Sequence, residues 1–317
     1  VDLNMHTKLL KLACLCLLLP FLAQAQRGLR IDSDRPGFGQ TPITVGKHYL
    51  QMQLGQQGGW LSGTNLGNSS FAEGNPSQTN LLLRFGLSNR TEIQLGASRM
   101  GFNRTTFEPL AGANLIDWAP GNYFPNSYSG RWNNLQLGLR HTFMDETQNK
   151  PFSLGFIGNY THQASADYSR QRDMAGHVQL GLLGSKTLSH RVSALGNIGV
   201  NQPIEVLVPR PNPYYLVHFD FDLGKNLYTF FETRQDFLTS DGGGNVSMFN
   251  TGLSWKLTPN FQFDVSGGYV RTDMLVENPS RNTPIIFPYA SREHYWFVGG
   301  GVSWKIKALP SKPQKAD

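Results

Sequence analysis

From Lys47 onward, apolar and polar residues alternate along the chain with a period of two rather than 3.6. Residues 135–140 alternate without a break, and residues 217–223 do the same. Successive side chains of a strand point to opposite faces, so this pattern predicts strands with one apolar and one polar face. In a lipid-facing barrel the apolar face lies outward, and polar residues or glycines face the lumen.

About twelve such runs can be counted, an even number that is typical of bacterial single-chain barrels. The predicted strands cover residues 47–60, 77–87, 91–100, 132–143, 152–162, 175–185, 192–201, 214–223, 227–238, 246–257, 260–270 and 294–306. Short connections alternate with long ones down the chain, as expected when one rim faces the periplasm and the other the outside. We therefore predict an all-β, antiparallel transmembrane barrel with long extracellular loops and short periplasmic turns.

The start of the chain has the features of a secretory signal peptide. Lys8 and Lys11 form a basic region, residues 12–22 an apolar stretch, and residues 23–25 a small-x-small cleavage site. The apolar stretch is about half as long as a membrane-spanning helix, which disfavours an uncleaved anchor. We expect residues 1–25 to be removed by cleavage before Gln26.

The mature chain shows no further domain boundary. Residues 26–46 are predicted to form an N-terminal periplasmic or plug segment, residues 47–306 the barrel, and residues 307–317 a flexible C-terminal tail. Both cysteines, Cys14 and Cys16, lie in the leader. The mature protein is therefore expected to have neither disulfides nor thiolate chemistry.

Composition and charge support a membrane protein built from strands. Charged residues make up 16% of the chain, against about 25% in typical soluble domains, while 34 glycines and 12% aromatic residues are present. No segment after the leader approaches the ~20 consecutive apolar residues of a membrane helix. The net charge of +6 is small and scattered, which argues against a nucleic-acid partner. We expect the protein to reside in a bacterial outer membrane.

Several segments resemble a Gram-negative outer-membrane family labelled as meta-pathway phenol degradation proteins, whose members are often called simply "transporter". The resemblance lies in residues 34–38 (Asp-Arg-Pro-Gly-Phe), 44–47, 251–264 and 296–304. It implies a channel-like barrel for small compounds, hydrophobic or aromatic ones included. It also implies an association with a degradation pathway, and not catalysis by the barrel itself.

Inward-facing polar positions are the candidate functional residues. His218, Asp220 and Asp222 share one face of a predicted strand because their spacing is two. Imidazole and carboxylates bind several cations, but same-face neighbours lie ~7 Å apart, which is wide for a shared ion. A wall of ion pairs and hydrogen bonds is the simpler interpretation. The predicted pore lining consists of Arg84, Glu92, Arg140, His218, Asp220, Asp222, Glu232, Arg234 and Asp264.

The segment Asp34, Arg35 and Pro36 is predicted to fold into the periplasmic mouth as a small plug. Its charges would need partners there, and Arg84 or Asp264 could provide them. The alternative is a loose lead into the first strand, as is common near chain termini.

The predicted function is an outer-membrane channel or transporter that passes small compounds by passive diffusion. One alternative is a non-conducting structural or adhesive barrel. An outer-membrane hydrolase is a weaker alternative, because no nucleophile motif and no Ser–His pairing at a fixed spacing is present. We therefore expect no enzyme activity and no cofactor. The expected partners are outer-membrane lipid, the barrel-assembly machinery and a small-molecule permeant.

Overall fold

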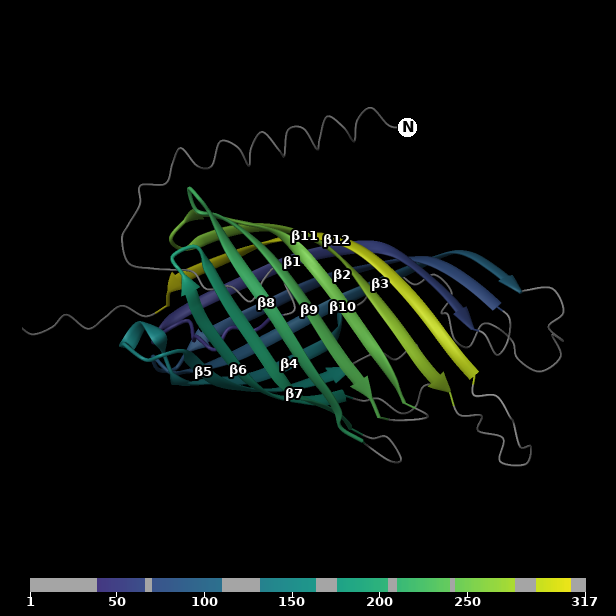
Figure 1. Cartoon of the computed structure of the whole chain (residues 1–317), viewed down its shortest axis with the longest axis horizontal. Coiled ribbons are helices and arrows are strands. Elements are labelled where there is room, and N and C mark those ends of the chain that lie inside the picture. Colours follow the sequence, from purple (N-terminus) through teal and green to yellow (C-terminus); the bar gives the residue numbers. More distant parts are fainter. Residues whose placement is uncertain are drawn as a thin grey trace, which may run out of the picture.

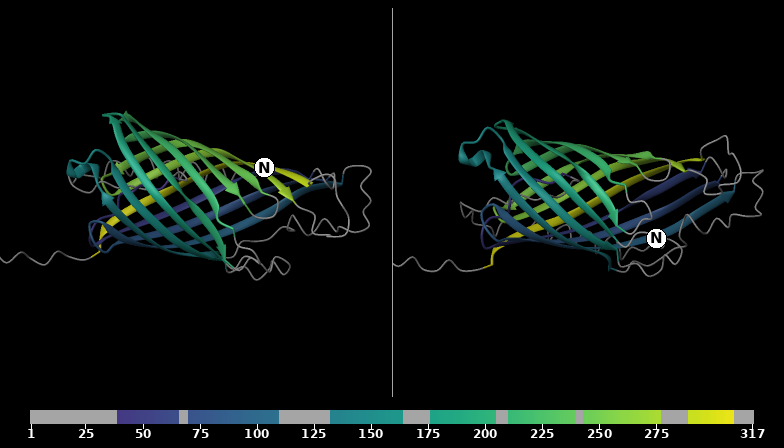
Figure 2. Two further views of the ribbon diagram at one scale, coloured as in Figure 1. Left: turned by 60° about the horizontal axis from the view of Figure 1, so that its bottom comes forward. Right: turned by 90° about the horizontal axis from the view of Figure 1, so that it is seen from below.

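The computed structural model describes residues 39–65, 70–109, 132–163, 176–204, 210–239, 243–276 and 289–308. Twelve strands within these ranges follow one another in antiparallel order and close into one barrel (Figures 1 and 2). Their bounds are β1 (Tyr49–Asn65), β2 (Ser70–Gly86), β3 (Thr91–Pro109), β4 (Trp132–Met144), β5 (Ser153–Gln163), β6 (Gly176–Ser189), β7 (Val192–Ile204), β8 (Asn212–Gly224), β9 (Leu227–Leu238), β10 (Gly244–Thr258), β11 (Phe261–Val276) and β12 (Tyr289–Lys307). The predicted fold class is confirmed.

Closure comes from the pairing of the first strand with the last. Tyr49 at the start of β1 lies opposite Lys307 at the end of β12, and the register continues without a shift to Asn65 opposite Ser291. A closed barrel leaves no unpaired strand edge, so every strand finds hydrogen-bonding neighbours on both sides.

The short connections gather at one rim, as predicted. Within the described ranges, a four-residue turn joins β2 to β3, and the 3-10 helix η3 (Glu146–Gln148) lies between β4 and β5. The β8–β9 turn places Lys225 and Asn226 at positive φ (52° and 64°), the backbone that tight hairpin turns require. We call this end the short-turn rim; in Figure 1 it lies at the left, and the opposite end is the long-loop rim.

Several strands extend further toward the long-loop rim than the sequence predicted. β3 was expected over residues 91–100 but runs to Pro109, and β2 starts at Ser70 instead of residue 77. The extensions pair with each other, for example Phe71 opposite Glu108. These polar stretches lack the apolar alternation on which the prediction depended, since strand pairing can continue beyond the apolar band of a barrel.

The barrel carries its apolar side chains outside and its polar ones inside. On β4, Leu135, Leu137 and Leu139 are exposed, whereas Gly138 and Arg140 between and beside them are buried. A continuous apolar exterior of this kind would be unstable in water and is suited to lipid. Across the described ranges, the structure contains no helix with the length and apolarity needed to cross a membrane.

Candidate functional site

A stretch of chain before β1 occupies part of the barrel lumen. Thr41, Thr44 and Val45 are buried although they precede the first strand. We refer to residues 39–46 as the luminal segment. Its contacts with the walls come from strands on both sides of the barrel, so the segment crosses the lumen instead of following one wall.

One end of the luminal segment rests on a buried group of charges. Arg84 donates to both carboxylate oxygens of Glu92, at 2.8 Å and 3.1 Å, and Arg140 Nε lies 3.7 Å from the same carboxylate. All three side chains are 0% exposed. The segment completes the arrangement: Val45 N–H donates to Glu92 at 2.8 Å, and Arg84 donates to the Ile43 carbonyl at 3.0 Å. We call Arg84, Glu92 and Arg140 the charged seat.

The other end of the segment is held by the opposite wall. Gly39 N–H donates to Glu232 Oε2 at 2.9 Å on β9. The Glu232 carboxylate also accepts from Asn250 at 2.9 Å and lies 3.1 Å from His218 Nδ1. The second ring nitrogen of His218 lies 3.1 Å from Asp220. We call His218, Glu232 and Asn250 the far anchor.

Between these ends, the walls bind backbone carbonyls of the segment. Thr142 Oγ1 on β4 donates to the Pro42 carbonyl at 2.6 Å, and Asn197 Nδ2 on β7 donates to the Gln40 carbonyl at 3.1 Å. Backbone groups away from water need such partners, because an unmade hydrogen bond is costly in a buried environment. Side chains of β2, β3, β4, β7 and β9 therefore hold the segment in place.

A tight turn redirects the chain from the lumen into β1. Gly46 has φ +87° and His48 φ 65°, and both lie in the left-handed region that glycine adopts most easily. Gly86 lies so close that a Cβ there would fall 1.8 Å from the Gly46 carbonyl oxygen. Asn89 fixes the turn from the β2–β3 connection, since its carbonyl accepts from Thr44 Oγ1 at 2.9 Å.

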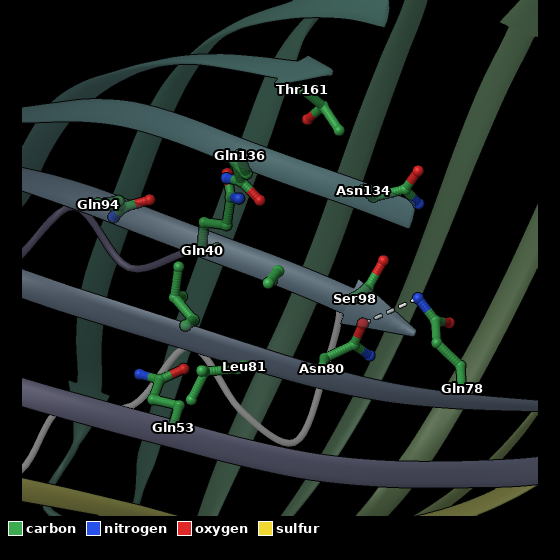
Figure 3. A pocket seen from close by; sticks show the side chains of 14 residues that line it. Gln40, Gln53, Gln78, Asn80, Leu81, Gln94, Ser98, Asn134, Gln136 and Thr161 are labelled. Atoms are coloured by element: carbon green, nitrogen blue, oxygen red, sulfur yellow. Dashed lines mark hydrogen bonds between the residues drawn. The ribbon is translucent and has the colours of Figure 1, made fainter. Parts of the chain in front are cut away.

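Beside the luminal segment, toward the long-loop rim, the lumen contains a cavity of about 310 Å³ between β1, β2, β3, β4 and β5 (Figure 3). None of its fourteen described lining residues carries a formal charge. Half of them carry side-chain amides: Gln40, Gln53, Gln78, Asn80, Gln94, Asn134 and Gln136. We call this cavity the amide chamber. Its floor includes Gly39 and Gln40 of the luminal segment.

The charged seat and the amide chamber are linked by one residue. Gln94 lines the chamber, and its Nε2 donates to Glu92 at 2.7 Å. Further amides along the wall are also bonded to one another: Gln57 donates to Gln78 at 2.9 Å, and Gln78 donates to Asn80 at 2.9 Å. Figure 3 shows the second of these bonds. These bonds fix which way the amides present their donors and acceptors.

Five of the predicted lining residues belong to the seat or the far anchor. These are Arg84, Glu92, Arg140, His218 and Glu232. They pack around the luminal segment and do not line the amide chamber. The part of the predicted plug formed by residues 34–36 lies outside the described residues, so its placement stays a prediction.

The other four predicted lining residues do not form one group. Asp220 contacts the anchor histidine, and Asp222 accepts from Gly224 N–H at 2.7 Å in the β8–β9 turn. Arg234 pairs at 2.7 Å with the carboxylate two residues further along its strand. Asp264 is fully buried on β11. Among the described residues, no group of three His, Cys, Asp or Glu side chains is placed to hold a metal ion, and this includes the side chains around His218.

Sequence reasoning missed the amides of the chamber. Gln53, Gln94 and Gln136 occupy inward positions of alternating runs, so the signal was present in the same pattern that singled out the charged residues. The predicted lining included only charged residues and histidine, and it therefore omitted these glutamines.

No protein-family model and no curated sequence matches the chain. Solved structures of outer-membrane barrels do match. An outer-membrane channel from Pseudomonas putida F1 gives a TM-score of 0.54 at 11% identity and covers 87% of this chain and 100% of that chain. The KdgM porin in complex with disordered oligogalacturonate gives 0.44 at 13% identity, with 81% and 98% covered. The CymD monoaromatic hydrocarbon channel gives 0.41 at 10% identity, with 82% and 89% covered. At these identities the likeness to the first of them shows a shared fold: the chain is a twelve-stranded barrel of the kind found in outer-membrane channels.

Proposed function

We propose that this protein is an outer-membrane channel that passes small compounds by passive diffusion. The observation that carries the proposal is a closed barrel with an apolar exterior and a polar, partly hollow lumen. The exterior suits lipid, and the cavity provides a polar space inside the lipid-embedded wall. The luminal segment would narrow the path on the periplasmic side and limit the size of what passes.

The location and the assembly route belong to the same proposal. The predicted signal peptide would direct the chain out of the cytoplasm, and the barrel-assembly machinery would insert it into outer-membrane lipid. No step of this function requires a cofactor or a catalytic residue.

Two permeant classes compete within this function. The family resemblance implies hydrophobic or aromatic compounds. The amide chamber favours polar ones, because its described lining offers hydrogen-bonding groups and no aromatic ring. A non-conducting barrel is the remaining alternative, and it would follow if the luminal segment sealed the path completely.

Solute-swelling assays with proteoliposomes test the proposed function. The chain from Gln26 onward would be refolded, and its folding checked by a heat-dependent shift in gel mobility. We expect liposomes that contain the protein to swell in small uncharged solutes and to exclude large ones. A folded, heat-modifiable barrel that leaves the liposomes impermeable to every solute would refute a channel and support the structural alternative.

A further inference from the structure

We propose that the amide chamber is a binding site for a small, neutral solute that carries several hydroxyl groups, such as a monosaccharide. This proposal rests on the proposed channel function and names its substrate class. It differs from the hydrophobic or aromatic compounds that the family resemblance implies.

The lining of the chamber disfavours a charged ligand. None of its described lining residues is acidic or basic, and the charges of the seat, which the chamber reaches through Gln94, are 0% exposed. A charged solute would lose hydration without gaining an opposite charge, which makes its transfer into the chamber unfavourable. A neutral solute incurs no such cost, so the chamber discriminates by charge.

Two side chains present hydrogen-bonding atoms that the described protein does not use. Gln53 is 1% exposed, and its Nε2 has no hydrogen-bond partner among the described residues. Gln40 Oε1 is likewise buried and without a partner there. One atom is a donor and the other an acceptor. A hydroxyl group both donates and accepts, so a polyol would satisfy both atoms once the two side chains turn toward it, whereas a hydrocarbon would satisfy neither.

The amides around the chamber are also fixed in orientation before any ligand arrives. Glu92 of the charged seat holds Gln94 through a 2.7 Å hydrogen bond, and Gln78 holds Asn80 at 2.9 Å. Pre-oriented groups lose less conformational freedom on binding, which favours affinity. Figure 3 shows these side chains on neighbouring strands around one space.

The size of the cavity agrees with a monosaccharide. Its volume is about 310 Å³. It lies at the small end of the roughly 300–1,000 Å³ range of small-molecule sites. A solute of monosaccharide size fits within such a space and reaches several of its amides.

Saturation-transfer difference NMR on the folded protein in micelles tests the proposal with glucose as the probe. We expect saturable binding of glucose, and binding of glucuronate, which has a similar size and a negative charge, at least about tenfold weaker. Gln53→Met and Gln136→Met should each weaken glucose binding about three- to tenfold, the loss of one or two hydrogen bonds. Gln56→Met is the matched control, because Gln56 lies on the same strand as Gln53 and is exposed on the outer face.

The proposal is overturned if glucose gives no saturable signal, if phenol or glucuronate binds as strongly as glucose, or if Gln56→Met weakens binding as much as the two chamber variants. Because the readout does not require conduction, it separates this proposal from the channel function. Glucose binding to a barrel that leaves liposomes impermeable would reject the channel and keep the site. Permeable liposomes without glucose binding would reject the site and keep the channel.

Discussion

The two halves of the lumen use polar side chains in opposite ways. Toward the short-turn rim, Glu92 is surrounded by two arginines, a glutamine and a backbone N–H of the luminal segment. Toward the long-loop rim, the chamber is lined by uncharged amides, two of which have buried atoms without partners among the described residues. The first half holds the luminal segment, and the second contains the cavity.

This difference assigns a separate role to each half: the charged seat stabilises the structure, and the amide chamber binds a ligand. A buried charge is tolerated only with opposite charges and hydrogen bonds around it, so the charged seat fixes the structure. A buried amide atom without a partner adds no stabilising bond to the fold, and a ligand or water can supply the missing partner. We therefore expect substitutions in the seat to affect stability, and substitutions in the chamber to affect binding.

The largest effect is expected at the carboxylate of the charged seat. Glu92→Gln removes the negative charge that Arg84 and Arg140 both contact, and it weakens the bond from Val45 N–H. Removing one partner of a buried charge group costs about 3–5 kcal/mol. Urea unfolding in liposomes should show this loss in the free energy of unfolding. A loss below about 1 kcal/mol would contradict the idea that the charged seat fixes the structure.

A matched pair of glutamines gives the sharpest test of the comparison. Gln94 and Gln53 are both 1% exposed and face the same lumen, but Gln94 donates to the Glu92 carboxylate, whereas Gln53 Nε2 has no hydrogen-bond partner among the described residues. We expect Gln94→Met to lower the free energy of unfolding by about 1.5–3 kcal/mol, the value of a hydrogen bond to a charged group. Gln53→Met should change it by less than about 1 kcal/mol, because it removes an unpartnered donor. If both variants lowered the free energy of unfolding equally, the proposed difference between the charged seat and the amide chamber would be wrong.

The tight turn between the luminal segment and β1 leaves no room for a side chain at Gly86. A Cβ there would meet the Gly46 carbonyl oxygen at 1.8 Å, so the backbone must move. We expect Gly86→Ala to cost about 1–3 kcal/mol, as for other overpacked sites, and to loosen the luminal segment. The matched control is Gly184→Ala, whose Cβ would meet its nearest atom at 3.7 Å. If thermal unfolding shows the same loss for both, the close approach at Gly86 has no structural importance.

The smallest effect is expected for a carboxylate–cation pair in water. Glu146 at the short-turn rim lies 3.2 Å from Lys186 Nζ and accepts from Thr187 N–H at 2.9 Å. Solvent screening limits such a pair to about 0–1 kcal/mol, so Glu146→Gln should barely change stability at neutral pH. If Glu146→Gln lowered the free energy of unfolding as much as Glu92→Gln, burial would not determine how strongly these carboxylates stabilise the fold.

The pH dependence of this small effect has a definite sign. The backbone hydrogen bond from Thr187, followed by the contacts with Lys186, holds the pKa of Glu146 below its ordinary value of 4.5. A lowered pKa in the folded state means that the contribution is present above pH 4.5 and is lost as pH falls through the folded pKa. The difference between the wild type and Glu146→Gln should therefore vanish in acid, as measured by urea unfolding at several pH values.

The sequence was sufficient to predict the barrel but not the contents of its lumen. Alternation with period two and the short turns predicted the strand number and order, because both patterns are local. Parity along each strand also indicated that Arg84, Glu92 and Arg140 point inward. It could not show that Arg84 binds residue 43 and that Glu92 binds residue 45, since those contacts depend on where the chain before β1 turns. The chamber was missed for a related reason: uncharged amides become notable only when three-dimensional packing leaves them around a cavity.

Single-channel current in a planar lipid bilayer tests the central claim most directly. The claim is that the barrel conducts and that the luminal segment limits its opening. The chain from Gln26 onward would be compared with a variant that starts at Lys47, after both have passed the heat-mobility test for folding. We predict small, discrete conductance steps for the longer chain and clearly larger steps for the variant. Folded barrels that stay electrically silent in both forms, or that conduct equally, would contradict this account.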